Sequence, residues 1–360
     1  AQLLGQIMDN YKNSVAVSGT HGKTTTTSMI SQILLAADCD PTITVGGMLK
    51  ALNGNLRVGK SDLFVSEACE YTNSFLHFYP KYSIILNIEA EHLDFFKDLN
   101  QIRDSFQQFA CHTKDDGTVF VNGDITDYPE LLEGIKSNII TFGLSDGCDF
   151  HPAAITFDIK ACASFRAMYR NEPLFEIKLN VPGMHNVTNA LAAIALAVSL
   201  KIPAADIQKG LFSFTGADRR FQYKGEKNGV TVIDDYAHHP TEIEATLTAA
   251  KKFPHKRLVL VFQPHTYSRT KAFLPDFARV LSQADLIVLA DIYAAREKNT
   301  YGIHSRDLLE ELEKSGKECF YFPSFKEIET YLEKNCMHGD LLITMGAGDI
   351  VNIGEHFLEH

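Results

Sequence analysis

GTHGKTTTT, from Gly19 to Thr27, is the stretch that decides the fold of this chain. The apolar segment Val15 to Val17 before it predicts a short strand, and Ser28 to Ala37 after it has apolar residues at helical spacing. A strand, a glycine-bearing turn ending in Gly-Lys-Thr and a helix form the layout of a phosphate-binding loop. Glycines let backbone N–H groups approach phosphate oxygens, and the helix start adds a positive dipole. We therefore expect a bound nucleoside triphosphate.

The residue types of this loop suit that chemistry. Lys23 would supply a charge for the β- and γ-phosphates, and the Thr24 hydroxyl can ligate Mg²⁺. The usual pattern has a glycine five residues before Gly22, where this chain has Val17. The alternative is a strand-to-helix turn with a capping threonine and no ligand, but the flanking strand and helix favour phosphate binding. The residues that we assign to the nucleotide here are Gly19, Thr20, His21, Gly22, Lys23, Thr24 and Thr25.

Bulk composition narrows the function classes. The chain has 360 residues, 45% hydrophobic and 22% charged, which is enough for two domains with sizeable cores. A net charge of -11 argues against a nucleic-acid or anionic-membrane surface. The seven cysteines are scattered singly, which favours a reducing cytoplasm over a disulfide framework or a zinc site. We see neither a signal peptide nor an apolar run of membrane-spanning length.

Strand and helix patterns alternate along the chain, which indicates α/β architecture with mainly parallel sheets. We place a first domain at residues 1–213, with an antiparallel excursion at Phe150 to Arg170 and Phe175 to Leu179 and a helix in Pro182 to Leu200. Its expected parallel strands are Ser14 to Val17, Leu63 to Ser66, Ser83 to Asn87, Thr118 to Asn122 and Ile139 to Phe142.

A second domain, residues 214–360, is expected to be doubly wound, because five strands alternate with four crossover helices. The strands are Val230 to Asp234, Arg257 to Phe262, Asp285 to Ala290, Cys319 to Phe322 and Leu341 to Met345. The helices are Pro240 to Lys252, Tyr267 to Gln283, Ser305 to Ser315 and Ser324 to Asn335.

Polar residues follow two strands of the first domain. Glu67 comes directly after a buried strand, where a carboxylate beside a phosphate loop can bind Mg²⁺. Glu91, His92 and Asp94 follow the next strand and suggest a second metal or catalytic cluster. A surface carboxylate and a structural histidine are the alternatives.

The second domain has two comparable clusters. Asp234 and Asp235 end a strand, and Tyr236, His238 and His239 follow before Pro240 opens a helix. We favour substrate binding over metal ligation for the histidines, because no cysteine or H-E-x-x-H spacing accompanies them. The next strand end offers His265 and Arg269, and arginine suits a bidentate carboxylate contact. Arg219 and Arg220, at the domain junction, are either a solvated basic pair or a source of charge for a phosphate.

Together these motifs resemble the Mur ligase family of ATP-dependent enzymes that form amide bonds. The match is carried, in the family's order, by GTHGKTTTT, SEACE, NIEAEHLD, PGMHNVTNALAA, DDYAHHPTE and QPHTYSRT. It runs over nearly the whole chain. DDYAHHPTE, PGMHN and QPHTYSRT are most similar to the members that add the first amino acid of peptidoglycan.

The resemblance implies a central phosphate-loop ATPase domain and a Rossmann-like C-terminal domain. It implies catalytic roles for Lys23, His92 and Arg269, and divalent-metal ligation by Thr24, Glu67 and His92. It places His185, Asn186 and Asn189 at the adenine. It also implies that two side chains of the C-terminal domain contact the nucleotide. One is Asp234 or Asp235, and the other is Arg219 or Arg220. Tyr236, His238, His265 and Arg269 would surround the amino-acid substrate.

The implied reaction joins L-alanine to the carboxylate of UDP-N-acetylmuramate through an acyl phosphate, in cytoplasmic cell-wall synthesis. ATP and two Mg²⁺ ions, with Mn²⁺ as an alternative, are the implied cofactors. The partners are small-molecule substrates, with no nucleic acid, membrane or obligatory protein partner. Family members normally begin with a UDP-binding domain that this chain lacks, so we interpret it as a fragment. Some members also have arginine where Thr266 stands, which would leave the alanine carboxylate more dependent on Arg269.

Three other functions stay open on sequence alone, one of which is a nucleotide-binding interaction module without catalysis. A murein peptide ligase, which adds a recycled tripeptide to the same sugar nucleotide, shares most of these motifs. A phosphate-loop NTPase switch would share GTHGKTTTT but would not need DDYAHHPTE or QPHTYSRT.

Overall fold

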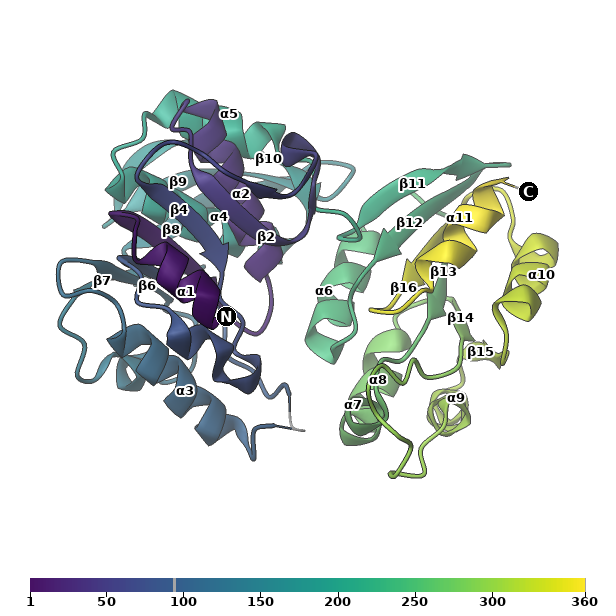
Figure 1. The fold of residues 1–360 in the computed structure, drawn as a ribbon. Helices are drawn as coiled ribbons and strands as arrows, with labels where there is room; N and C mark the ends of the chain where they lie inside the picture. Colours follow the sequence, from purple (N-terminus) through teal and green to yellow (C-terminus); the bar gives the residue numbers. More distant parts are fainter. Residues whose placement is uncertain (93–94, 360) are drawn as a thin grey trace. The chain divides into compact units, whose positions relative to one another are not determined.

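The computed structural model describes residues 1–92 and 95–359, so Asp94 of the predicted second cluster lies outside the described residues. The chain divides into two compact units (Figure 1). The first unit comprises Ala1–Asp158 and Cys162–Asp218, and the second comprises Ile159–Ala161 and Arg219–His360. Our domain boundary at residue 213 therefore precedes the division at Asp218 and Arg219. Phe214, which we placed in the second domain, is buried in the core of the first.

The first unit is built on a ten-stranded sheet with the order β10-β9-β8-β7-β6-β5-β1-β4-β2-β3. The strands β1, β2, β4, β5, β6 and β7 pair in parallel. All of them except β2 were predicted, because buried parallel strands have near-continuous apolar runs. Their bounds are β1 Asn13–Ser18, β2 Thr42–Leu49, β4 Leu63–Glu67, β5 Tyr82–Ile85, β6 Thr118–Asn122 and β7 Asn138–Phe142.

Antiparallel strands close both edges of this sheet. The predicted excursion forms β8 (Phe150–Phe157), β9 (Cys162–Tyr169) and β10 (Glu172–Pro182). At the other edge β3 (Gly54–Arg57) pairs antiparallel with β2. Neither β2 nor β3 was predicted, because β2 contains Gly46 and Gly47 and β3 is short and largely exposed.

Helices cover both faces of the sheet (Figure 1). One core cluster packs α2 (Lys23–Ala36), α4 (Met184–Ser199) and α5 (Ala204–Ser213) on one face. On the other face the core includes α1 (Gln2–Met8) and α3 (Leu99–Cys111). Short 3₁₀ segments complete the unit: η1 Lys50–Leu52, η2 Tyr71–His77 and η3 Tyr128–Leu132.

The second unit contains a six-stranded sheet with the order β11-β12-β16-β13-β14-β15. The five predicted strands all pair in parallel: β12 Val230–Asp235, β13 Arg257–Phe262, β14 Leu286–Leu289, β15 Glu318–Tyr321 and β16 Asp340–Met345. The unpredicted edge strand β11 (Gln222–Lys227) is antiparallel to β12. Its polar sequence, QYKGEK, lacks the apolar residues that mark a strand.

Helices on both faces make this unit doubly wound, as predicted. One core contains side chains of α6 (Pro240–Ala250), α8 (Leu274–Leu281) and α9 (Ser305–Lys314), and the other contains those of α10 (Phe325–Asn335) and α11 (Val351–Glu359). The helix that we expected from Tyr267 to Gln283 is interrupted at Phe273, between α7 (Tyr267–Ala272) and α8. Pro275 lies in the first turn of α8, and proline cannot continue a helix from the preceding turn.

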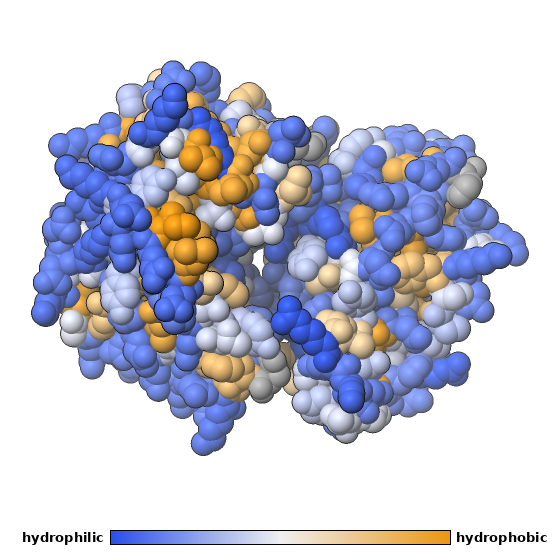
Figure 2. Space-filling view, in the orientation of Figure 1, coloured by the Kyte–Doolittle hydropathy of each residue, from blue (hydrophilic) through white to orange (hydrophobic). Residues whose placement is uncertain are grey.

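The surface contrasts with these apolar cores. The view in Figure 2 is mainly hydrophilic, with separate apolar patches. Large apolar side chains that are exposed include Leu3, Met48, Leu56 and Val58 in the first unit. Of the helices in the described part of the chain, none has the length and apolar character needed to cross a bilayer.

Candidate active site

Three neighbouring strands bring the predicted residues of the first unit together. β1 lies between β4 and β5, and all three run in parallel. The phosphate loop follows β1, Glu67 ends β4, and Asn87 follows β5. Carboxyl ends of parallel strands meet at one sheet edge, the usual place for ligands in α/β folds. The three sequence motifs therefore converge because the topology places β1 between the other two strands.

The loop has the backbone geometry that its glycines permit. Gly22 precedes α2 with φ of 84°, in the left-handed region that favours glycine. A Cβ there would lie 2.7 Å from Oδ1 of Asn189, so this α4 side chain contacts the loop directly. Asn189 donates to Oδ1 of Asn186 at 3.1 Å, and both are buried. His185, which directly precedes Asn186, is by contrast exposed.

The loop is also tied to the end of β5. The backbone N–H of His21 donates to Oδ1 of Asn87 at 2.7 Å, and Nδ2 of Asn87 donates to the His21 carbonyl at 3.0 Å. The hydroxyl of Thr20 accepts from the Glu89 N–H at 2.9 Å. These contacts hold the turn in place without using the N–H groups at the start of α2.

Lys23 makes an ion pair that was not predicted from the sequence. Its Nζ donates to the carbonyls of Gly19 at 2.5 Å and Thr20 at 3.0 Å, and to Oε2 of Glu70 at 2.9 Å. Burial alone would lower the pKa of Lys23, but the neighbouring Glu70 raises it above its ordinary value. Glu70 is only 2% exposed, and Lys23 together with His92 holds its pKa below the usual range despite the burial.

Thr24 and Glu67 form a second pair. The Thr24 hydroxyl donates to Oε2 of Glu67 at 3.1 Å, and Oε1 of Glu67 accepts the backbone N–H of Gly46 at 2.6 Å. A Cβ on Gly46 would lie 2.9 Å from Oε2 of Glu67. The glycine in β2 therefore makes room for the carboxylate, and it joins the site from a strand that was not predicted.

His92 joins the Lys23–Glu70 pair rather than the Thr24–Glu67 pair. Its Nε2 lies 3.5 Å from Oε1 of Glu70, and its ring lies 4.5 Å from the ring of Tyr71. Oε1 of Glu70 is buried and has no hydrogen-bond partner among residues 1–92 and 95–359. A buried carboxylate oxygen beside a histidine and near a hydroxyl-carboxylate pair fits a divalent cation.

In the second unit, the four predicted substrate residues form one cluster at the ends of β12 and β13. The His238 ring lies 5.6 Å from the Tyr236 ring and 5.5 Å from the His265 ring. Nη1 of Arg269 lies 2.9 Å from Nδ1 of His265 and donates to the His265 carbonyl at 3.0 Å. The cluster therefore presents a guanidinium beside imidazole and phenol rings, a combination suited to a small carboxylate-bearing ligand.

Two residues of the loop after β14 complete this cluster and were missed from sequence. The Tyr293 ring stacks on His265 with centroids 5.6 Å apart, and its carbonyl accepts the Thr266 N–H at 2.9 Å. The Glu297 carboxylate accepts the backbone N–H of Tyr267 at 2.7 Å and that of Ser268 at 2.9 Å. The loop around Tyr293 and Glu297 has no sequence periodicity that would have indicated these contacts.

Arg219 and Asp234 form an ion pair whose contacts all lie within the second unit. Nε of Arg219 donates to Oδ2 of Asp234 at 2.8 Å, and its two terminal nitrogens donate to the carbonyls of Gly346 and Gly348, each at 2.8 Å. Asp234 also accepts from the Thr344 hydroxyl at 2.8 Å and is fully buried. All three nitrogen groups of Arg219 are thus used within its own unit.

Arg220 and Asp235 have different surroundings. Nη1 of Arg220 lies 3.4 Å from Oε1 of Glu242, and the guanidinium lies 5.4 Å from the Tyr236 ring. Asp235 accepts the N–H groups of Ala237 at 2.7 Å and of Phe221 at 2.8 Å. Burial raises the pKa of Asp235 to about 6. Arg220 is thus held by contacts different from those of Arg219, and its predicted contact with the nucleotide stays a prediction, as does that of Asp235.

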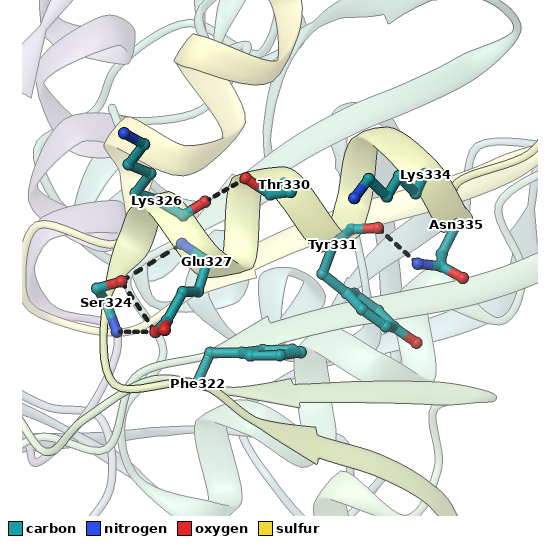
Figure 3. Close-up of a pocket in the computed structure, with 8 residues that line it drawn as sticks. All are labelled: Phe322, Ser324, Lys326, Glu327, Thr330, Tyr331, Lys334 and Asn335. Atoms are coloured by element: carbon teal, nitrogen blue, oxygen red, sulfur yellow. Dashed lines mark hydrogen bonds between the residues drawn. The ribbon is translucent and has the colours of Figure 1, made fainter.

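A surface cavity of about 610 Å³ lies elsewhere in the second unit, along α10 (Figure 3). Its lining residues are Phe322, Ser324, Lys326, Glu327, Thr330, Tyr331, Lys334 and Asn335. Ser324 and Glu327 are engaged with each other in the capping box of α10. The lining shares no residue with the clusters described above.

Both units match models of known domains. The Mur ligase middle domain matches residues 17–197, and the Mur ligase, glutamate ligase domain matches residues 219–348. The chain belongs to the Mur ligase family. The resemblance inferred from six motifs is thereby confirmed, and with it the fold class of both domains. Mur ligases are ATP-dependent enzymes that form amide bonds, which agrees with a phosphate loop in the first unit.

Individual Mur ligases match over the whole chain. UDP-N-acetylmuramate–L-alanine ligase of Agathobacter rectalis is 66% identical over 359 residues, covering 100% of this chain and 78% of the relative. The enzyme of the same name from Lachnospira eligens is 54% identical over 360 residues, with the same coverage. The crystal structure of UDP-N-acetylmuramate-alanine ligase MurC from Thermotoga maritima superposes with a TM-score of 0.83 at 30% identity, covering 98% of this chain and 76% of that one.

Proposed function

We propose that this chain carries the catalytic machinery of an ATP-dependent ligase that joins L-alanine to the carboxylate of UDP-N-acetylmuramate. The observation that carries the proposal is the 66% identity, along the whole chain, to a protein with that name. The alternative of a murein peptide ligase is supported less well. The solved structure of such an enzyme from Psychrobacter arcticus is 23% identical to this chain, a level that shows the fold alone.

In the proposed reaction, the first unit holds ATP and the sugar-nucleotide carboxylate. Lys23 stabilises the charge on the β- and γ-phosphates, together with the N–H groups at the start of α2. The carboxylate attacks the γ-phosphorus, ADP leaves, and an acyl phosphate results. Glu70 lies 2.9 Å from the Lys23 ammonium group. We propose that it keeps this partly buried ammonium group charged and oriented. Asn186 and Asn189, with His185, are proposed to contact the adenine.

Divalent cations are proposed at two places in this unit. Thr24 and Glu67 would hold one Mg²⁺ ion, and His92 would contribute to a second, with Glu70 beside it. Bound there, Mg²⁺ or Mn²⁺ would neutralise the phosphate and carboxylate anions that the reaction brings together.

The second unit is proposed to bind the amino acid. Arg269 would hold the alanine carboxylate, while Tyr236, His238 and His265 would enclose the small side chain and the amine. Arg220 would contact the nucleotide phosphates, whereas Arg219 and Asp234 would act through the Gly346–Gly348 turn that they fix. The alanine amine then attacks the acyl carbon and inorganic phosphate leaves.

Phosphate release by the protein that carries this chain tests the proposal. We expect release from ATP only when UDP-N-acetylmuramate and L-alanine are both present. Release that needs a tripeptide would support the murein peptide ligase, and release that ignores both substrates would support an NTPase switch. Lys23→Ala should weaken ATP binding strongly, and unchanged affinity would contradict the phosphate-loop assignment.

A further inference from the structure

The second unit contains a histidine and a glutamate whose contacts are those of a base and its orienting group. Nδ1 of His238 lies 3.0 Å from the carbonyl oxygen of Tyr236 and 3.3 Å from Oε2 of Glu242. Oε2 of Glu242 also accepts the backbone N–H of His238 at 3.2 Å. Both side chains are largely buried, with exposed fractions of 19% for His238 and 11% for Glu242.

These contacts decide the tautomer of His238. A carbonyl and a carboxylate can only accept, so Nδ1 carries the ring proton and donates it. Nε2 then carries the lone pair of the ring, which can accept a proton. This is the arrangement in which a carboxylate fixes an imidazole for general-base work.

The reaction needs such a base on the amino-acid side. An amino acid at neutral pH carries an ammonium group, which has no lone pair for attack on an acyl phosphate. An α-amino acid also has its amine and carboxylate on one carbon, so a carboxylate held by Arg269 leaves the amine nearby. Arg269 contacts His265, whose ring lies 5.5 Å from that of His238, so the separation suits a ligand of this size.

We propose that His238 is the general base that deprotonates the incoming amine, and that Glu242 is the positioning residue that holds its tautomer. This rests on the ligase function proposed above. Nε2 of His238 takes one proton from the ammonium group, which becomes a neutral amine. The amine's lone pair forms the C–N bond, and the C–O bond to phosphorus breaks with its electron pair on the departing phosphate. The second proton leaves the nitrogen for that phosphate, and His238 returns its proton to water.

Glu242 holds the His238 ring through Nδ1, so its loss should act on the chemical step rather than on nucleotide binding. Glu242→Gln should lower the maximal alanine-dependent rate, with a much smaller change in the KM for ATP.

Hydroxylamine separates the base from the rest of the machinery. It is an unprotonated nucleophile at neutral pH and converts an acyl phosphate to a hydroxamate without help from a base. The protein that carries this chain is assayed with ATP, UDP-N-acetylmuramate and either L-alanine or hydroxylamine. We expect His238→Asn, which keeps a donor near the Nδ1 position, to lose about 100-fold or more of the alanine-dependent rate, the range of general-base catalysis. The rate at which His238→Asn forms the hydroxamate should fall far less.

The controls make each outcome decisive. His356 and Glu329 form a similar pair, with Nδ1 2.8 Å from Oε1, on the exposed surface between α11 and α10. His356→Asn and Glu329→Gln should change neither rate, and His238→Gln provides a second base-free variant if His238→Asn does not fold. Equal alanine rates in wild type and His238→Asn, or a proportional loss of both rates, would overturn the proposal. If the wild type forms neither product, the ligase function itself fails.

Discussion

Nζ of Lys23 lies 2.9 Å from Oε2 of Glu70, a carboxylate that is 2% exposed. The lysine of the phosphate loop is therefore paired with a buried anion that lies after β4, at the start of η2. Nε2 of His92 lies 3.5 Å from Oε1, the other oxygen of the same carboxylate. The pair is part of the stability of the first unit as well as of its proposed chemistry.

Replacing Glu70 by Gln should destabilise the first unit by about 3 kcal/mol, because it leaves a buried ammonium group without its partner. The pKa of Glu70 is held below its ordinary value, so its stabilisation is present above that value and is lost as the pH falls. Urea unfolding at several pH values measures both effects. Asp116→Asn removes an exposed pair with Lys81, at 3.0 Å, and should change stability by less than about 1 kcal/mol. Equal effects of the two substitutions would contradict a special role for Glu70.

Gly46→Ala should displace the Glu67 carboxylate, since the new Cβ would lie 2.9 Å from Oε2. We expect the Mg²⁺-dependent part of ATP binding to weaken roughly tenfold or more, as in Glu67→Ala. Calorimetric titration with and without Mg²⁺ measures it. Gly54→Ala in β3 is the matched control, because its nearest contact would be 3.9 Å. Identical ATP affinities with and without Mg²⁺ in all variants would count against the Thr24–Glu67 site.

Arg269→Lys should raise the KM for alanine by roughly 10- to 100-fold, with a smaller change in kcat, because a bidentate carboxylate contact is lost. Steady-state kinetics with varied alanine measure the two constants. Arg279→Lys, in an exposed pair with Glu244 at 3.0 Å, should leave both unchanged. If KM for alanine stays constant in Arg269→Lys, the carboxylate binds elsewhere.

Asp235 should make the second unit less stable as the pH rises from about 4 to about 6. Burial raises its pKa to about 6, so the folded unit holds the proton more tightly than the unfolded chain over that range. The cost above pH 6 is about 2 to 3 kcal/mol by linkage. The stability of wild type minus that of Asp235→Asn, measured by denaturant unfolding against pH, should fall by this amount. A constant or rising difference would show that the pKa of the Asp235 carboxyl is not raised.

The sequence predicted the parallel strands well because they are buried on both faces and are read as continuous apolar runs. It missed β2, which contains Gly46 and Gly47, and β11, which has the polar sequence QYKGEK. Neither segment has the composition of a strand, and pairing with a neighbouring strand is what stabilises each of them. The predicted residues Thr24, at the start of α2, and Glu67, at the end of β4, do contact each other. The topology that places β1 between β4 and β5 explains why.

The missed site residues share a different cause. Glu70 is three residues from Glu67 and of the same type, and the sequence cannot tell which carboxylate is buried against Lys23. Its position in SEACE, between a strand and a non-periodic segment, was the available signal. Tyr293 and Glu297 lie in an irregular loop about 30 residues from the turn that they contact. Contacts of that kind depend on loop conformation, which apolar periodicity does not report.

Transfer of oxygen-18 tests the central claim most directly. UDP-N-acetylmuramate labelled in its carboxylate is incubated with ATP, L-alanine and the protein that carries this chain, and both products are analysed by mass spectrometry. An acyl phosphate requires one labelled oxygen to pass from the carboxylate to the released phosphate, with alanine joined to the sugar nucleotide. We expect labelled phosphate and the alanyl product in equal amounts. Unlabelled phosphate, or labelled phosphate without an alanyl product, would contradict the account.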